Sequence, residues 1–121
     1  RSPVPVQLNV DVPIRPSPTV EAIAYFCVSE ALTNVAKHAQ ARWAQVDVCF
    51  ADGALTVRVA DDGVGGADPG KGTGLDGLRD RVRAVDGTMT VTSPPAGGTV
   101  LVATLPDPRA TEAANPYRSP Q

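Results

Sequence analysis

The sequence is poor in the residue types that several common functions require. Of its 121 residues only 4% are aromatic, and it has two cysteines, one histidine, a net charge of -2 and no run of Lys or Arg. Nucleic-acid binding usually needs a basic stripe and is therefore disfavoured. No apolar run approaches the roughly 20 residues of a membrane span, and no signal peptide is visible. We expect no contact with nucleic acid or membrane.

The two cysteines, Cys27 and Cys49, do not form a Cys-x-x-Cys pair, and a single histidine cannot complete a zinc site with them. We expect both to be packing thiols in a reducing compartment. A hydrophobic fraction of 42% and a charged fraction of 20% are typical of a soluble globular domain. The length allows one domain with its own core.

Hydrophobic periodicity predicts the order β-α-β-β-α-β-β. Alternation predicts a half-buried strand over 6–12, a hairpin of strands 44–50 and 55–59 around Asp52-Gly53, and strands 88–93 and 99–105. A helix is expected over 19–39, with Ser17 as N-cap and Pro18 as first helical residue, and another over 75–86, stopped by Gly87. The predicted core-facing helical residues are Ile23, Phe26, Cys27, Leu32 and Val35, then Leu75, Leu78, Val82 and Val85.

Two helices for five strands suggest that both helices cover one face of the sheet. We therefore expect an α/β fold, a two-layer sandwich with a mixed sheet. The ordered domain is predicted over 1–105. The Pro- and Ala-rich tail, 106–121, is expected to be disordered.

The first predicted helix carries polar residues on one side. Glu30, Asn34, Lys37 and His38 stand at i, i+4, i+7 and i+8, which cluster at 100° per residue. They can form a solvated ladder of side chains. Alternatively, Asn34 can offer an oxygen to Mg²⁺, Glu30 can accept a proton, and Lys37 can neutralise phosphate. A single helical histidine is more often a packing or hydrogen-bonding group than a phosphoacceptor.

Asp61 follows a strand and precedes Gly63 and Gly65. This segment can be a tight turn. It can also be a base pocket, because a carboxylate at a core edge can accept a hydrogen bond from the exocyclic amine of adenine, whereas guanine offers a carbonyl there. The glycines remove side chains that would block the base.

A glycine turn, Gly72-Thr73-Gly74, leads through Leu75 into the second helix. It can be a flexible linker or a phosphate-binding helix N-terminus. It matches neither the Walker loop nor the dinucleotide fingerprint. Thr99 opens the last strand, where its hydroxyl can join Asp61 around a base.

Together these motifs resemble the catalytic ATP-binding domain of bacterial sensor histidine kinases, in the superfamily of gyrase, Hsp90 and MutL. Residues 30–38 are similar to the N box, 61–65 to the G1 box and 72–74 to the G2 box. The sequence motifs at 30–39 and 72–81 are most similar to those of the subfamily that pairs with response regulators carrying a LuxR-type DNA-binding domain. The F box is missing, as is usual there. The resemblance spans roughly residues 4–105 and implies the Bergerat-type ATP-binding fold.

The resemblance implies a role for each matched position. Glu30 corresponds to the acid/base residue, Asn34 to the Mg²⁺ ligand, Lys37 to the phosphate-contacting cation and Asp61 to the adenine-reading carboxylate. His38 stands where other kinases carry an aromatic residue near the nucleotide. The remaining nucleotide-binding positions are Gly63, Gly65, Gly72, Thr73, Gly74, Leu75 and Thr99.

The implied function is binding of Mg-ATP and transfer of the γ-phosphoryl group to a histidine on a dimerisation helix, which we expect to precede Arg1 in a longer chain. The implied partners are those helices and a response regulator. The fragment is expected to be monomeric and to belong to the cytoplasmic part of a sensor. An anti-sigma-factor-type serine kinase and a non-catalytic docking module of the same fold remain as alternatives.

Overall fold

A computed structural model describes residues 4–64 and 74–109 of the protein, with the backbone alone at 38 and 39. The elements follow the predicted order. The strands are β1 (Val6–Asp11), β2 (Ala44–Ala51), β3 (Ala54–Asp61), β4 (Thr88–Thr92) and β5 (Thr99–Pro106). Helix α1 (Pro18–Asn34) continues into a π-helical turn, η1 (Val35–Ala39), and helix α2 spans Leu75–Arg83.

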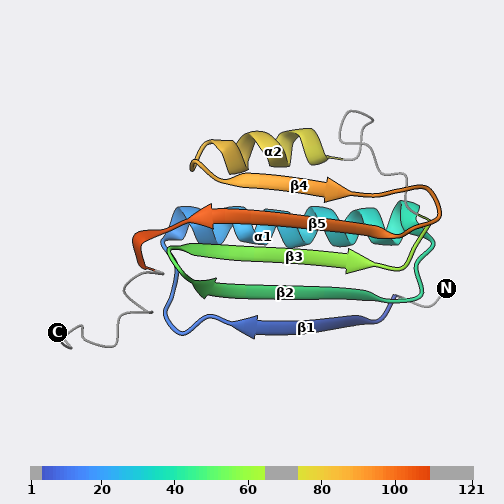
Figure 1. The fold of residues 1–121 in the computed structure, drawn as a ribbon, viewed down its shortest axis with the longest axis horizontal. Helices are drawn as coiled ribbons and strands as arrows, with labels where there is room; N and C mark the ends of the chain where they lie inside the picture. Colours follow the sequence, from blue (N-terminus) through green and yellow to red (C-terminus); the bar gives the residue numbers. More distant parts are fainter. Residues whose placement is uncertain (1–3, 65–73, 110–121) are drawn as a thin grey trace.

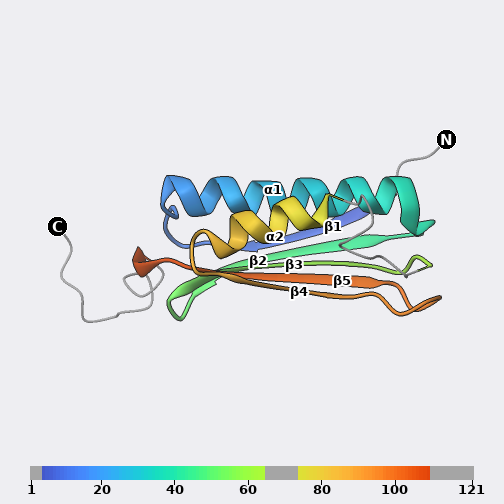
Figure 2. The same ribbon diagram turned by 90° about the horizontal axis from the view of Figure 1, so that it is seen from above.

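The five strands form one mixed sheet in the order β1-β2-β3-β5-β4. β1 runs parallel to β2, and the other neighbours are antiparallel. Figure 1 shows the open face of the sheet with α1 behind it, and Figure 2 shows both helices on the same side. The predicted two-layer α/β sandwich with a mixed sheet is confirmed. Within the described ranges no helix is long and apolar enough to cross a membrane.

The hairpin between β2 and β3 forms at the predicted Asp-Gly turn. Asp52 and Gly53 both have positive φ, 56° and 82°. This is the conformation that matches the twist of two-residue hairpins and that Asp-Gly adopts readily. The turn sets the β2–β3 register, in which Ala51 pairs with Ala54. β3 lies at the centre of the sheet between β2 and β5, and its apolar side chains belong to the core.

Helix α1 begins as predicted. Ser17 is its N-cap and accepts a 3.4 Å hydrogen bond from the Val20 N–H, and Pro18 is the first helical residue. The helix buries one side against the sheet, and α2 buries its own apolar stripe beside it. The helical residues in the core are Val20, Ile23, Ala24, Cys27, Ala31, Val35, Leu75, Leu78 and Val82.

Three expectations about packing are wrong. Phe26 is 37% exposed, and its ring lies 4.0 Å from the guanidinium carbon of Arg81 on α2. Cys49 is exposed, whereas Cys27 is fully buried. Burial raises the pKa of the Cys27 thiol to about 11, so this side chain behaves as an inert packing group.

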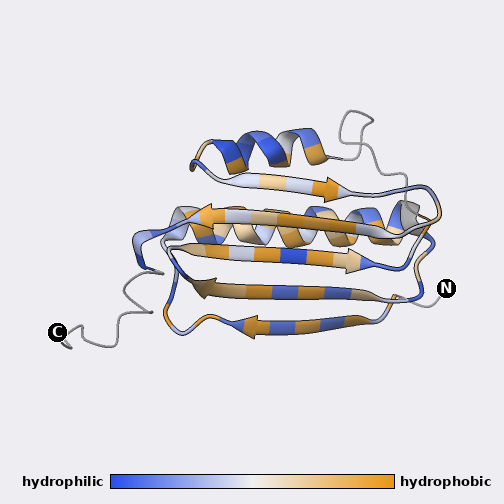
Figure 3. Cartoon of the chain, in the orientation of Figure 1, coloured by the Kyte–Doolittle hydropathy of each residue, from blue (hydrophilic) through white to orange (hydrophobic). Residues whose placement is uncertain are grey.

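The third concerns β1, which was expected to be half-buried and is exposed at every position. Leu8 is 62% and Val10 59% exposed, because α1 packs mainly over β3 and β5. Figure 3 shows polar and apolar residues alternating along β1 and β2 on the sheet. The alternation predicts the strand correctly but not which strand the helix covers.

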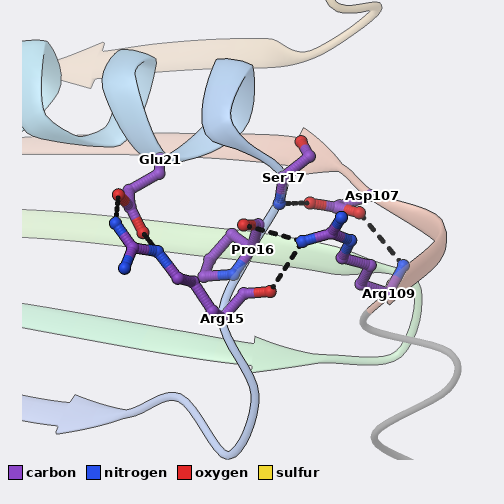
Figure 4. Close-up of polar contacts among 6 residues, drawn as sticks. All are labelled: Arg15, Pro16, Ser17, Glu21, Asp107 and Arg109. Atoms are coloured by element: carbon purple, nitrogen blue, oxygen red, sulfur yellow. Dashed lines mark hydrogen bonds and ion pairs between the residues drawn. The ribbon is translucent and has the colours of Figure 1, made fainter.

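The ordered domain extends beyond the expected boundary at residue 105. Pro106 is the last residue of β5, and Asp107 is only 2% exposed. The Asp107 carboxylate accepts hydrogen bonds from the N–H groups of Ser17, at 2.9 Å, and Arg109, at 3.0 Å. Figure 4 shows this clamp, with Arg109 also donating to the carbonyls of Arg15 and Pro16. Residues 106–109 therefore belong to the domain, and 110–121 lie outside the described residues.

The clamp fixes the N-terminus of α1 through a residue about 90 positions later in the chain. Burial raises the pKa of Asp107, but the N–H donors from Ser17 and Arg109 outweigh it and hold the pKa below its usual value. The carboxylate is therefore ionised at neutral pH. A negative charge at this position also complements the helix dipole.

Replacing Asp107 with Ala removes the carboxylate that accepts hydrogen bonds from the N–H groups of Ser17 and Arg109. We expect the free energy of unfolding to fall by about 1–3 kcal/mol, measured by urea denaturation at neutral pH. Asp80→Ala, an exposed carboxylate on α2, is the matched control and should change it by less than about 0.5 kcal/mol. Equal stabilities of the two variants would show that the clamp does not hold the helix.

Candidate nucleotide-binding site

The predicted site residues that the structure describes gather at one end of the molecule. There α1 and β3 end, while α2 and β5 begin (Figure 1). Glu30 and Asn34 lie on α1, Asp61 is the last residue of β3, and Thr99 is the first residue of β5. The sheet topology thus brings together residues from three separate parts of the sequence.

Asp61 is a buried carboxyl group, 8% exposed. Its Oδ1 accepts a 2.7 Å hydrogen bond from the Gly63 N–H. Burial raises its pKa and the nearby charge of Asp62 adds to this, whereas the N–H groups of Gly63 and Thr99 act in the opposite direction. The net direction is upward. A carboxylate held at a core edge in this way can accept a hydrogen bond from a bound ligand.

Two glycines keep the backbone close around Asp61. Gly63 is buried. Gly98 has φ 76°, and a Cβ atom there would collide with the Asp61 carbonyl oxygen. Gly98 was not among the predicted site residues. Its signal was the Gly97-Gly98 pair directly before the strand that opens at Thr99.

Thr99 pairs with Asp61 across the β3–β5 ladder. Its Oγ1 lies 2.6 Å from the Ser93 Oγ, so the hydroxyl is already part of a hydrogen bond within the protein. Its N–H points to the Asp61 carboxylate. The prediction that Thr99 lies beside Asp61 agrees with this register.

The polar side of α1 is only partly regular. Glu30 and Asn34 are one turn apart within α1 and are both partly exposed. Lys37 and His38 lie in η1, where the π-helical turn changes the spacing, so the 100° argument does not extend to them. Lys37 is exposed. Gln40, with φ 52°, ends the turn.

Gly74 is the N-cap of α2 and has φ 82°. The Glu30 carboxylate lies directly against it, so that a Cβ atom at Gly74 would collide with Glu30 Oε2. Leu75, 2% exposed, anchors the first turn in the core. The structure therefore brings Glu30 to the N-terminus of α2, beside the predicted phosphate-binding turn.

The predicted residues Gly65, Gly72 and Thr73 lie outside the described residues. Among the residues that are described, no group of three His, Cys, Asp or Glu side chains could hold a metal ion. A magnesium ion carried by phosphates keeps several waters and needs only one or two protein oxygens. The amide oxygen of Asn34 fits that requirement.

The arrangement has a buried carboxylate at one side, and an amide, a carboxylate and a helix N-terminus at the other. The chain belongs to the family of histidine kinase-, DNA gyrase B- and HSP90-like ATPases, which it matches over residues 19–109. This match includes residues 106–109, in agreement with the extended domain.

Several curated relatives that the chain resembles are named sensor histidine kinases. It is 35% identical to the oxygen sensor histidine kinase NreB of Staphylococcus carnosus, over 72% of this chain and 26% of that protein. It is 33% identical to the sensor histidine kinase DesK of Bacillus subtilis, over 72% and 24% respectively. The chain thus spans about a quarter of the length of these relatives.

Solved structures of the same kind share the fold. The blue-light activated histidine kinase EL346 of Erythrobacter litoralis superposes with a TM-score of 0.72 at 26% identity, covering 88% of this chain and 36% of that one. The ATP binding domain of PrrB from Mycobacterium tuberculosis superposes with a TM-score of 0.64 at 25% identity, covering 89% and 83%. The Bergerat-type fold is therefore confirmed.

Asp61→Asn tests the cost of burying this carboxyl group. Its folded-state pKa lies above the unfolded value, so its contribution to stability is complete below the unfolded pKa and is lost as the pH rises through the folded-state pKa. We expect the free energy of unfolding of the parent, minus that of the variant, to fall as the pH rises from the unfolded-state pKa of about 3.9 through the raised folded-state pKa of Asp61. Urea titrations of both proteins measure this difference, and a difference that rises with pH would contradict the prediction.

Gly74→Ala tests the close approach of Glu30 to α2. An alanine must adopt a positive φ, which costs about 1–2 kcal/mol, and it must also displace the Glu30 carboxylate. Gly77→Ala is the matched control. It makes the same substitution within α2, at a position where nothing lies within 4 Å of the added Cβ. It should stabilise the domain by about 0.5–1 kcal/mol. If thermal unfolding shows that Gly74→Ala is as stable as Gly77→Ala, the close approach of Glu30 to Gly74 is contradicted.

Proposed function

We propose that this domain binds Mg-ATP and transfers the γ-phosphoryl group to a histidine on a dimerisation helix of a longer sensor kinase. The observation that carries the proposal is the pairing of the buried Asp61 carboxylate with the Glu30 and Asn34 side chains at the same end of the sheet. The family and the sensor-kinase relatives support it.

Adenine is recognised by Asp61 in this proposal. The ionised carboxylate accepts a hydrogen bond from the exocyclic amine, and the absence of a side chain at Gly63 lets the ring approach. Guanine presents a carbonyl oxygen at the same edge, which the carboxylate repels. The site therefore favours adenine nucleotides over guanine nucleotides.

The phosphates extend toward α2 and the end of α1. The N-terminus of α2, where Gly74 makes no side-chain cap, faces them with its first N–H groups, and the exposed ammonium group of Lys37 lowers their charge. Asn34 holds Mg²⁺ through its amide oxygen, and the ion neutralises charge on the phosphates when bound. We propose that Gly65 shapes the adenine pocket together with Gly63, that Gly72 and Thr73 belong to the phosphate-binding turn, and that His38 lies near the nucleotide.

Glu30 acts as the base in the transfer step. The attacking imidazole nitrogen forms a bond to the γ-phosphorus, the bond to the oxygen of ADP breaks, and the imidazole proton passes to the Glu30 carboxylate. The acceptor histidine lies outside this chain. A response regulator, of the class with a LuxR-type DNA-binding domain, then receives the phosphoryl group. We propose that the fragment itself is a cytoplasmic monomer.

Nucleotide titration tests the adenine site. Asp61→Asn should weaken Mg-ATP binding on the order of 10- to 100-fold, because a hydrogen bond to a charged group contributes about 1.5–3 kcal/mol. Isothermal calorimetry measures the affinity. The control is Asp47→Asn. The Asp47 carboxylate accepts hydrogen bonds from the Asn9 and Gln45 side chains on the sheet, so this variant should bind Mg-ATP as the parent does. No binding of ATP by the parent, or unchanged affinity in Asp61→Asn, would overturn the proposal.

A further inference from the structure

Asp62 makes a contact that the proposed binding steps do not use. Its Oδ1 accepts hydrogen bonds from two consecutive backbone N–H groups, that of Arg42 at 2.8 Å and that of Trp43 at 3.0 Å. The Arg42 side chain adds only a 3.8 Å ion pair and is 94% exposed. The carboxylate therefore binds the backbone of the segment before β2 far more closely than it binds the neighbouring cation.

The sheet register explains why Asp62 reaches this segment. Asp61 pairs with Ala44 as the last pair of the β2–β3 ladder. Successive side chains of a strand point to opposite faces, so Asp61 turns toward the core edge while Asp62 points away from it. Beyond the last backbone pair, the Asp62 side chain takes over as acceptor for the N–H groups of Arg42 and Trp43.

This contact joins the two halves of the proposed site. Asp61 stands at the end of β3, whereas Asn34 and Lys37 stand at the end of α1 and in η1. Residues 40–43 connect η1 to β2, and this connection carries the two N–H groups that Asp62 binds. The carboxylate thereby ties the phosphate side of the site to the adenine side.

The charge state of Asp62 suits this role. The N–H group of Trp43 lowers the pKa of Asp62, and the N–H group of Arg42 lowers it further. Partial burial raises this pKa but is outweighed, so the pKa lies below its usual value. The group is therefore a full carboxylate at neutral pH. It accepts the hydrogen bonds of both N–H groups and donates none.

We infer that Asp62 is a positioning residue, whose bonds to the backbone of Arg42 and Trp43 hold Asp61 and the end of α1 in the relative placement that adenine nucleotides require. This inference rests on the proposed function. It assigns to Asp62 no contact with the nucleotide.

Three variants of the chain test the inference by calorimetry with Mg-ATP. Asp62→Ala removes the acceptor and should weaken binding by about 10-fold, because displacement of binding groups by a fraction of an ångström has effects of this order. Asp62→Asn keeps an oxygen that can accept both N–H groups and should stay within about 3-fold of the parent. Arg42→Ala removes the ion pair alone and should also bind as the parent does.

The fluorescence of Trp43, the single tryptophan, supplies a second readout. Because Asp62 binds the Trp43 N–H, this contact should transmit nucleotide binding at the site to Trp43. We therefore expect the Trp43 emission to change on addition of Mg-ATP in the parent and in Asp62→Asn. It should stay constant in Asp62→Ala at saturating nucleotide. A residue that merely stabilised the fold would not remove this response. Circular dichroism establishes that each variant is folded. Should Asp62→Ala not fold, Asp62→Leu, which also carries no acceptor, replaces it, with the same expected direction.

The outcomes separate this inference from the proposed function. If the parent binds Mg-ATP and Asp61→Asn weakens binding, but Asp62→Ala binds like the parent, the positioning role is wrong and the nucleotide site stands. If Asp62→Asn or Arg42→Ala loses as much affinity as Asp62→Ala, the bridge to the backbone is wrong. If the parent does not bind Mg-ATP at all, both fail together.

Discussion

The buried carboxyl group of Asp61 constrains the end of the sheet at which the site lies. A carboxylate that is 8% exposed must be surrounded by donors, and here they are the backbone N–H groups of Gly63 and Thr99. These donors are available only if the chain turns sharply after β3 and if β5 begins directly opposite. The close approach at Gly98, where no side chain fits, follows from the same requirement. Satisfying one buried group thus determines the path of two loops.

Helix α1 is the second fixed part of the molecule. Its N-terminus is held by Asp107, its middle packs on β3 and β5, and its side toward α2 carries Phe26 under Arg81. Glu30 reaches the start of α2 from the same helix. Because α1 is anchored at its far end by the last residues of the domain, its other end can present Glu30 and Asn34 in a defined place. The clamp and the site are the two ends of one rigid element.

Much of this arrangement could be predicted from local patterns. Alternation and capping residues predicted every strand and both helices, since these depend on neighbours within a few positions, and the Asp52-Gly53 turn formed as its residue types require. The glycines and carboxylates of the motifs predicted Asp61, Thr99 and Gly74 as site residues. The end of α1 was predicted less well, because periodicity alone cannot detect that the helix changes to a π-helical turn at Val35.

The sequence by itself therefore determined the order of the elements, the hairpin register and the residue types of the site, because propensity, turn chemistry and motif spacing are local. Only the tertiary structure decided that Asp107 belongs to the domain, that β1 is left exposed, and that Asp62 binds the backbone before β2. These depend on contacts between residues about 20 to 90 positions apart. Such contacts arise from the packing of the whole sheet and leave no periodic trace in the chain.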